Sequence, residues 1–197
     1  MRTIALTFLC MTMLALCSCI PVSDFGAFWD KGTVDPALVG KWDEIPGKDA
    51  PPPEAGKENK SSIEITSDNG AYKIDSLDEE ERKKADYAPM AARTLTAGSY
   101  AFLMVKEGTD KDGDMIRYKI EGDVFREYTL NDGQMAALLK QKYPGAKNIG
   151  KPECKEEKCL FDGLRIEVLD DEVYKILSEI PDTPEFWTAE DKYRRQK

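Results

Sequence analysis

The chain has 197 residues, 41% of them apolar, so it can bury the core of one domain but is short for two. It has 28 basic against 37 acidic side chains, a net charge of −9 and no basic face, which excludes the usual nucleic-acid binders. It has no His, which excludes Ser-His and Cys-His catalytic pairs.

Residues 1–18 have the pattern of an export signal. One charge, at Arg2, precedes an apolar stretch that ends at Leu16 and is too short to cross a bilayer as a helix. A small residue, Ser18, stands directly before Cys19, and Leu16 stands three positions before it. This pattern resembles the cleavage and acylation motif of bacterial lipoproteins.

The lipoprotein resemblance implies that Cys19 becomes the first residue of the mature chain and that its thiol receives a diacylglycerol. The lipidated Cys19 would have diacylglyceryl and palmitate-type acyl chains. Two or more acyl chains hold a protein on a membrane stably, whereas a single acyl chain binds the membrane only marginally. Ile20 follows in place of an Asp, which favours the inner leaflet of the outer membrane, facing the periplasm. A plain secretory signal with a chance cysteine is the alternative interpretation.

After cleavage and lipidation, the remaining cysteines are Cys154 and Cys159. In an oxidising periplasm, this pair is expected to form a disulfide that closes a small loop. A redox pair would have Cys-x-x-Cys spacing, and a zinc site would need more ligands than a chain without His provides. A structural disulfide is therefore the favoured prediction.

The mature chain divides into a tether and one domain. Residues 19–36 are expected to form the lipidated tether, with Phe25, Phe28 and Trp29 either folding back onto the domain or lying near the bilayer. The domain is expected over 37–190, with 191–197 as a polar tail.

Strands are predicted where apolar and polar residues alternate. The first is expected from Leu38 to Trp42 and on to Ile45, followed by a Pro-rich exposed loop over 47–61. The Asn69-Gly70 pair between two alternating runs predicts a hairpin. The stretch 100–105 is apolar on both faces and should be the most buried strand. Strands over 115–120, 124–130 and 164–168 complete the set.

Two helices and one helical turn are predicted between these strands. Asn131 has capping spacing to Gln134, and a helix from there ends at Pro144. Asp170 caps a second helix that extends to Ile180, with a hairpin as the alternative. The charged run 78–84 is interpreted as a solvated helical turn.

Antiparallel strands in meander order predict a mainly β, β-rich α+β fold that curls into a small barrel or half-barrel with two short helices. The stretch Leu38-Val39-Gly40-Lys41-Trp42 resembles the Gly-x-Trp start of small lipocalin-like proteins. The chain also resembles a group of uncharacterised bacterial lipoproteins in the order of its motifs. That order is the Gly-x-Trp motif, then Gly70-x-Tyr72, then Phe102-Leu103, then the two helices. The added helices and the Pro-rich insertion depart from true lipocalins.

An acidic run resembles the ligand positions of a calcium loop. Its members are Asp110, Asp112, Asp114 and Glu121. However, Met115 occupies the position that needs Gly, and strands rather than helices are predicted on both sides, so an acidic turn is favoured. No metal or other cofactor is therefore expected.

Five strand aromatics are candidates for lining a ligand pocket, or for filling the core. They are Tyr72, Tyr100, Phe102, Tyr118 and Tyr128.

Three functions follow from these features. The first is a non-enzymatic binding or scaffold module of the envelope that meets a partner through a sheet edge or the loop 47–61. The second is a carrier of a lipid or small apolar ligand, and the third is a His-free hydrolase. A crowded interior favours the first, a hollow interior the second and a cluster of buried acids the third.

Overall fold

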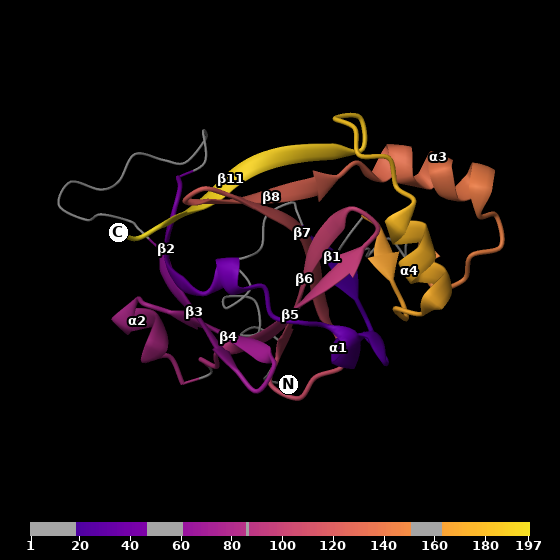
Figure 1. Ribbon diagram of the computed structural model, residues 1–197. Helices are drawn as coiled ribbons and strands as arrows, with labels where there is room; N and C mark the ends of the chain where they lie inside the picture. The colour runs from indigo at the N-terminus through magenta and orange to yellow at the C-terminus, as the bar shows by residue number, and fades with distance from the viewer. Residues whose placement is uncertain (1–18, 47–60, 86, 151–162) are drawn as a thin grey trace, which may run out of the picture.

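The computed structural model describes residues 19–46, 61–85, 87–150 and 163–197. Its centre is a closed antiparallel barrel of eight strands, which pair in chain order and close where the last strand, β11, pairs with the first, β2 (Figure 1). The barrel strands are β2 (Gly40–Glu44), β3 (Ser62–Asp68), β4 (Ala71–Ser76), β5 (Met90–Ala97), β6 (Tyr100–Glu107), β7 (Gly113–Glu121), β8 (Val124–Leu130) and β11 (Trp187–Arg195). The predicted meander is confirmed, and the barrel is complete rather than half-formed.

The hairpin between β3 and β4 turns where its sequence predicts. Asn69 and Gly70 both have positive φ, 51° and 76°, and Asp68 pairs with Ala71 across the turn. Positive φ at both central residues gives the turn a twist that matches the flanking strands. Asn and Gly adopt this conformation at low cost, so local chemistry alone fixes this register.

Three short strands extend the sheet outward from β7. β1 (Cys19–Val22) pairs antiparallel with the first half of β7, with Cys19 opposite Ile116. β8 pairs with the second half of β7. β1 and β8 therefore pair one after the other with the same strand. β10 (Arg165–Ile166) then pairs with β1, and β9 (Ile149–Gly150) pairs with β10.

The segment 19–36, expected as a tether, is instead part of the folded domain. After β1 come α1 (Phe28–Lys31) and the 3-10 helix η2 (Pro36–Leu38). Phe25 and Phe28 are 2% and 5% exposed. Of the two expected positions for these aromatics, the structure has them folded back onto the domain, where their rings pack with the strand residues of one hydrophobic core.

The two predicted helices are present with their predicted caps. α3 (Asp132–Lys142) begins after Asn131, whose Oδ1 accepts a hydrogen bond from Gln134 N at 3.1 Å. α4 (Asp171–Ser178) begins after Asp170, whose Oδ1 accepts from Val173 N at 2.8 Å, so the helix prediction rather than the hairpin is correct. α2 (Glu79–Arg82) is the predicted single turn.

The C-terminal segment differs from its prediction. Residues 191–195 belong to β11, which lies between β8 and β2 and closes the barrel. A bulge between Asp191 and Tyr193 interrupts the alternation, which hides the strand pattern in a polar sequence. The strand expected over 164–168 shrinks to the two residues of β10, and Val168 is 37% exposed.

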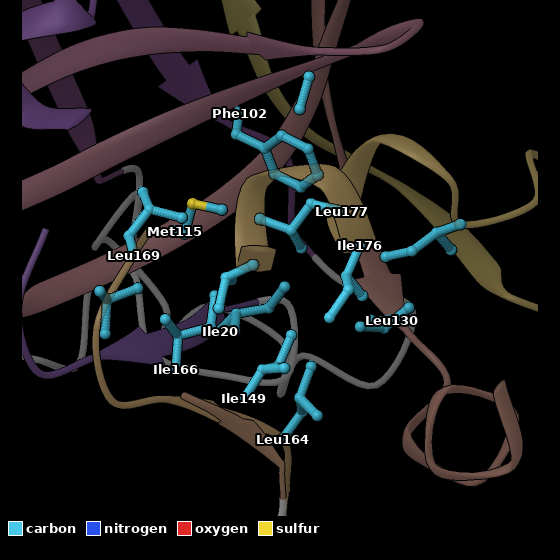
Figure 2. Packing of buried hydrophobic residues seen from close by; sticks show 14 of the residues in the cluster. Ile20, Phe102, Met115, Leu130, Ile149, Leu164, Ile166, Leu169, Ile176 and Leu177 are labelled. Atoms are coloured by element: carbon cyan, nitrogen blue, oxygen red, sulfur yellow. The ribbon is translucent and has the colours of Figure 1, made fainter. Parts of the chain in front are cut away.

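The barrel wall separates two apolar cores. The inner core fills the barrel and contains Leu38, Trp42, Ile63, Ile65, Tyr72, Ile74, Ala92, Leu103, Val105, Ile116, Tyr118, Phe125 and Tyr193. The outer core lies between the wall, α4 and the strands β1 and β10, where Ile20, Ile166 and Ile176 converge (Figure 2). Since β6 contributes to both cores, the prediction that it is deeply buried is confirmed.

Candidate functional site

One end of the barrel is sealed around Trp42. Its indole is 1% exposed and its Nε1 donates to the carbonyl of Leu38 at 2.8 Å. The guanidinium carbon of Arg195 lies 4.3 Å from a ring centroid of Trp42, and Nη1 donates to the carbonyl of Val39 at 2.7 Å. The contacts of Arg195 thus join the last strand to the segment around η2 and cover the Trp42 ring.

Buried hydroxyl groups occupy the interior near η2. Thr94 Oγ1 lies 3.1 Å from Tyr72 Oη and 2.8 Å from Tyr118 Oη. Tyr72 Oη donates to the carbonyl of Asp35 at 3.1 Å, and Tyr118 Oη donates to its carboxylate at 3.3 Å. Burial raises the pKa of both tyrosines. These two candidates for ligand lining therefore fill and cross-link the interior.

The other three candidates lie outside the barrel and help to fill the outer core, so they do not line a pocket in the barrel interior. Tyr100 and Phe102 face the outer core, and the ring of half-buried Tyr128 packs against it. The guanidinium carbon of Arg117 lies 4.3 Å from the ring centroids of Tyr100 and Tyr128 and 4.4 Å from that of Trp187. These rings enclose a structural cation instead of a ligand.

An apolar cavity occupies the opposite end of the interior, where α2 covers the barrel. Its volume is about 40 Å³, well below the ~300–1,000 Å³ of pockets that enclose drug-sized ligands. Its lining is Trp42, Ile63, Ile65, Ile74, Ser76, Glu81, Tyr87, Ala88, Met90, Leu103, Glu107, Phe125 and Tyr193. The interior is thus filled at one end and narrowly open at the other, and the aromatic members of this lining were missed from sequence.

The cavity has a buried carboxylate, that of Glu81 on α2. The Glu81 side chain is 9% exposed, and its Oε2 has no hydrogen-bond partner among the described residues. Its Oε1 lies 3.9 Å from Lys84 Nζ, beyond hydrogen-bond distance. The burial of Glu81 could not be predicted from the sequence, because Glu81 lies in a charged run that is typical of a solvated turn.

Further carboxylates surround the hydroxyl of Tyr193. Burial raises the pKa of Tyr193, and the charges of Glu127, Glu44 and Glu81 raise it further. Glu127 is 1% exposed. None of the described residues that line the cavity is basic. Among the described residues, the charged side chains that line the cavity are therefore all acidic.

The acidic run that resembles a calcium loop does not form one. Asp114 and Glu121 lie toward opposite ends of β7, and seven residues of strand span ~23 Å. In the part of the chain that the structure describes, no three His, Cys, Asp or Glu side chains are grouped to hold a metal ion.

Cys19 begins β1 and lies against the inner core, in register with Ile116. It is close enough to Tyr193 to contribute to the raised pKa of that phenol. Cys154 and Cys159, the predicted disulfide pair, lie outside the described residues. No helix among the described residues is long and apolar enough to span a membrane.

Comparison of the chain with protein families, with curated proteins and with solved structures found no match.

Proposed function

We propose that the protein is a membrane-anchored lipoprotein that faces the periplasm and acts as a non-enzymatic binding module, taking a slender apolar ligand at the α2 end of its barrel. The observation that carries this proposal is the narrow apolar cavity that contains the buried carboxylate of Glu81. The sealed end around Trp42 supports a single entrance, at α2.

The Glu81 carboxylate favours ligand binding over a purely structural barrel. A buried polar atom without a partner costs ~1–3 kcal/mol, and more when it is charged. An apolar side chain at this position would fill the cavity and avoid that cost. A binding site therefore accounts for Glu81 better than a purely structural barrel does.

The position of Cys19 supports an anchor that lies directly beside the barrel. Ile20, the next residue, is 3% exposed in the outer core, so almost no chain is left as a linker. A diacylglyceryl group on the Cys19 thiol would not fit in the inner core, so lipidation would require Cys19 to leave its register with Ile116. The barrel would then lie close to the bilayer, from which apolar molecules enter.

A protein-interaction module is the second candidate. The closed barrel has no exposed edge of its own, and the outermost strand of the extension is the two-residue β9. The loop 47–61, the other expected contact surface, lies almost wholly outside the described residues. The crowded η2 end of the interior is the observation that favours this candidate.

Two experiments test the proposal. Cys19→Ala is expected to release the protein from membranes and to abolish its acylation, measured by fractionation and intact mass; acylation that survives would contradict the anchor. Native mass spectrometry of a Cys19→Ser mature chain, exported to a periplasm, is expected to show a stoichiometric apolar adduct. The cavity-filling variant Ile74→Phe should lose this adduct, and a bare mass in both proteins would favour the interaction module.

A further inference from the structure

We infer that the ligand is a cationic amphiphile, an alkyl chain with a protonated amine head that donates hydrogen bonds to Glu81. This inference rests on the proposed function and adds the chemical class of the ligand. The feature behind it is an apolar cavity whose only charged side chains, among the described residues, are carboxylates.

The fold directs Glu81 into the cavity. The Asp78 carboxylate accepts hydrogen bonds from Glu80 N at 2.8 Å and Glu81 N at 3.4 Å, which fixes the start of α2. Arg82 Nε donates to the carbonyl of Ser76 and ties the end of α2 to β4. With both ends held, Glu81 is the buried residue of this charged turn, while its neighbours remain exposed.

The charges around the cavity mouth favour a cation. Glu107 also lines the cavity, and the charges of Glu44 and Glu127 act on Tyr193, another lining residue. Among the described residues, the basic group that pairs with Glu81 is Lys84, whose side chain is 41% exposed. Coulomb interactions are stronger among apolar walls than in water, so this site should repel a carboxylate head and attract an ammonium head.

An organic cation matches the site better than a metal ion. Calcium needs six to eight oxygen ligands, whereas no group of three potential metal ligands exists among the described residues. The vacant partner position at Glu81 Oε2 needs one N–H donor. A primary ammonium supplies that donor, and the first carbons of its alkyl chain would lie along Leu103 and Phe125. The rest of the chain would extend from the cavity mouth, because the cavity holds only about 40 Å³.

The test compares four probes with the same chain length on the Cys19→Ser mature protein by isothermal titration calorimetry, below their micelle concentrations. The probes are dodecylamine, dodecanol, dodecanoate and dodecyltrimethylammonium. We expect dodecylamine to bind at least about tenfold more tightly than the other three, because it alone combines positive charge with N–H donors.

Variants then locate the preference. Glu81→Gln should reduce dodecylamine affinity to that of dodecanol while dodecanol binding persists, and Glu80→Gln, its exposed neighbour, should behave as wild type. Equal affinities for all probes, or an amine preference that survives in Glu81→Gln, would overturn the inference but leave an apolar ligand site. Failure of every probe to bind would instead overturn the proposed function. The trimethylammonium probe keeps the test valid on the wild-type protein if Glu81→Gln fails to fold.

Discussion

Arg195 lies across the indole of Trp42, with its guanidinium carbon 4.3 Å from a ring centroid, and joins the last strand of the barrel to the first. Its Nη1 donates to the carbonyl of Val39, directly after η2, and its Nη2 donates to the carbonyl of Ala37, within η2. Arg195, near the C-terminus, thus covers the end of the barrel at which β2, the first barrel strand, starts.

Arg195→Ala should lower the free energy of unfolding by about 1–3 kcal/mol, because a cation-aromatic contact and charge-assisted hydrogen bonds are lost together. Urea denaturation measures the change. Arg194→Ala provides the control, since Arg194 is exposed on the same strand and its loss should change stability by less than ~0.5 kcal/mol. Equal effects of the two variants would mean that Arg195 does not seal the barrel.

Local chemistry predicted the parts of the fold that depend on a few neighbouring residues. The Asn69-Gly70 turn and the helix starts at Asn131 and Asp170 are of this kind. Each is fixed by a backbone conformation or a side-chain cap that the sequence displays directly. The meander order followed because short turns join strands that pair with their chain neighbours.

Features that depend on distant contacts could not be predicted in the same way. β6 is apolar on both faces, so its pattern does not show that Phe102 points outward and Leu103 inward. β11 is polar and bulged, and it forms a strand because it pairs with β2 on one side and with β8 on the other. Glu81 is buried because α2 folds over the barrel, which a charged run does not reveal.

Removing residues 19–33 should destabilise the domain severely. The deletion takes Ile20, Val22, Phe25 and Phe28 out of the outer core. Each buried apolar side chain contributes ~1.5–3 kcal/mol, so the total approaches the ~5–15 kcal/mol stability of a typical domain. Thermal unfolding of a chain that starts at Val34, compared with one that starts at Ile20, measures this. Identical melting temperatures would show that the segment is a detachable tether after all.

Arg117 should stabilise the outer core through its aromatic neighbours. Arg117→Ala leaves a void between Tyr100, Tyr128 and Trp187, and should cost about 2–4 kcal/mol in urea unfolding. Arg117→Met should cost less, because it refills the void and removes the buried Nη1, which has no hydrogen-bond partner among the described residues.

Lys119→Ala is the matched control for Arg117, since Lys119 lies on the same strand with an exposed side chain. A loss below ~0.5 kcal/mol in Arg117→Ala, equal to that control, would mean that the three rings hold their positions without the cation.

Asp170 should make stability depend on acid pH. The hydrogen bond from Val173 N holds the pKa of Asp170 below its usual range, outweighing the effect of burial. Its contribution is therefore fully present above the unfolded-state pKa of ~3.9 and is lost as pH falls through the lower folded-state value. Asp170→Asn should lose less stability than wild type between neutral pH and pH ~3, measured by urea midpoints. A wild-type pH slope in Asp170→Asn would contradict the assignment.

The most direct test of the binding site uses the fluorescence of Trp42, which lines the cavity, while Trp29 and Trp187 pack in the outer core. A Cys19→Ser chain with Trp29→Phe and Trp187→Phe reports on Trp42 alone, and a dodecylamine that is brominated along its chain quenches only a nearby indole. We predict saturable quenching with one ligand per protein, abolished in the Ile74→Phe background. Absence of quenching, or quenching that persists when the cavity is filled, would contradict a ligand site inside the barrel.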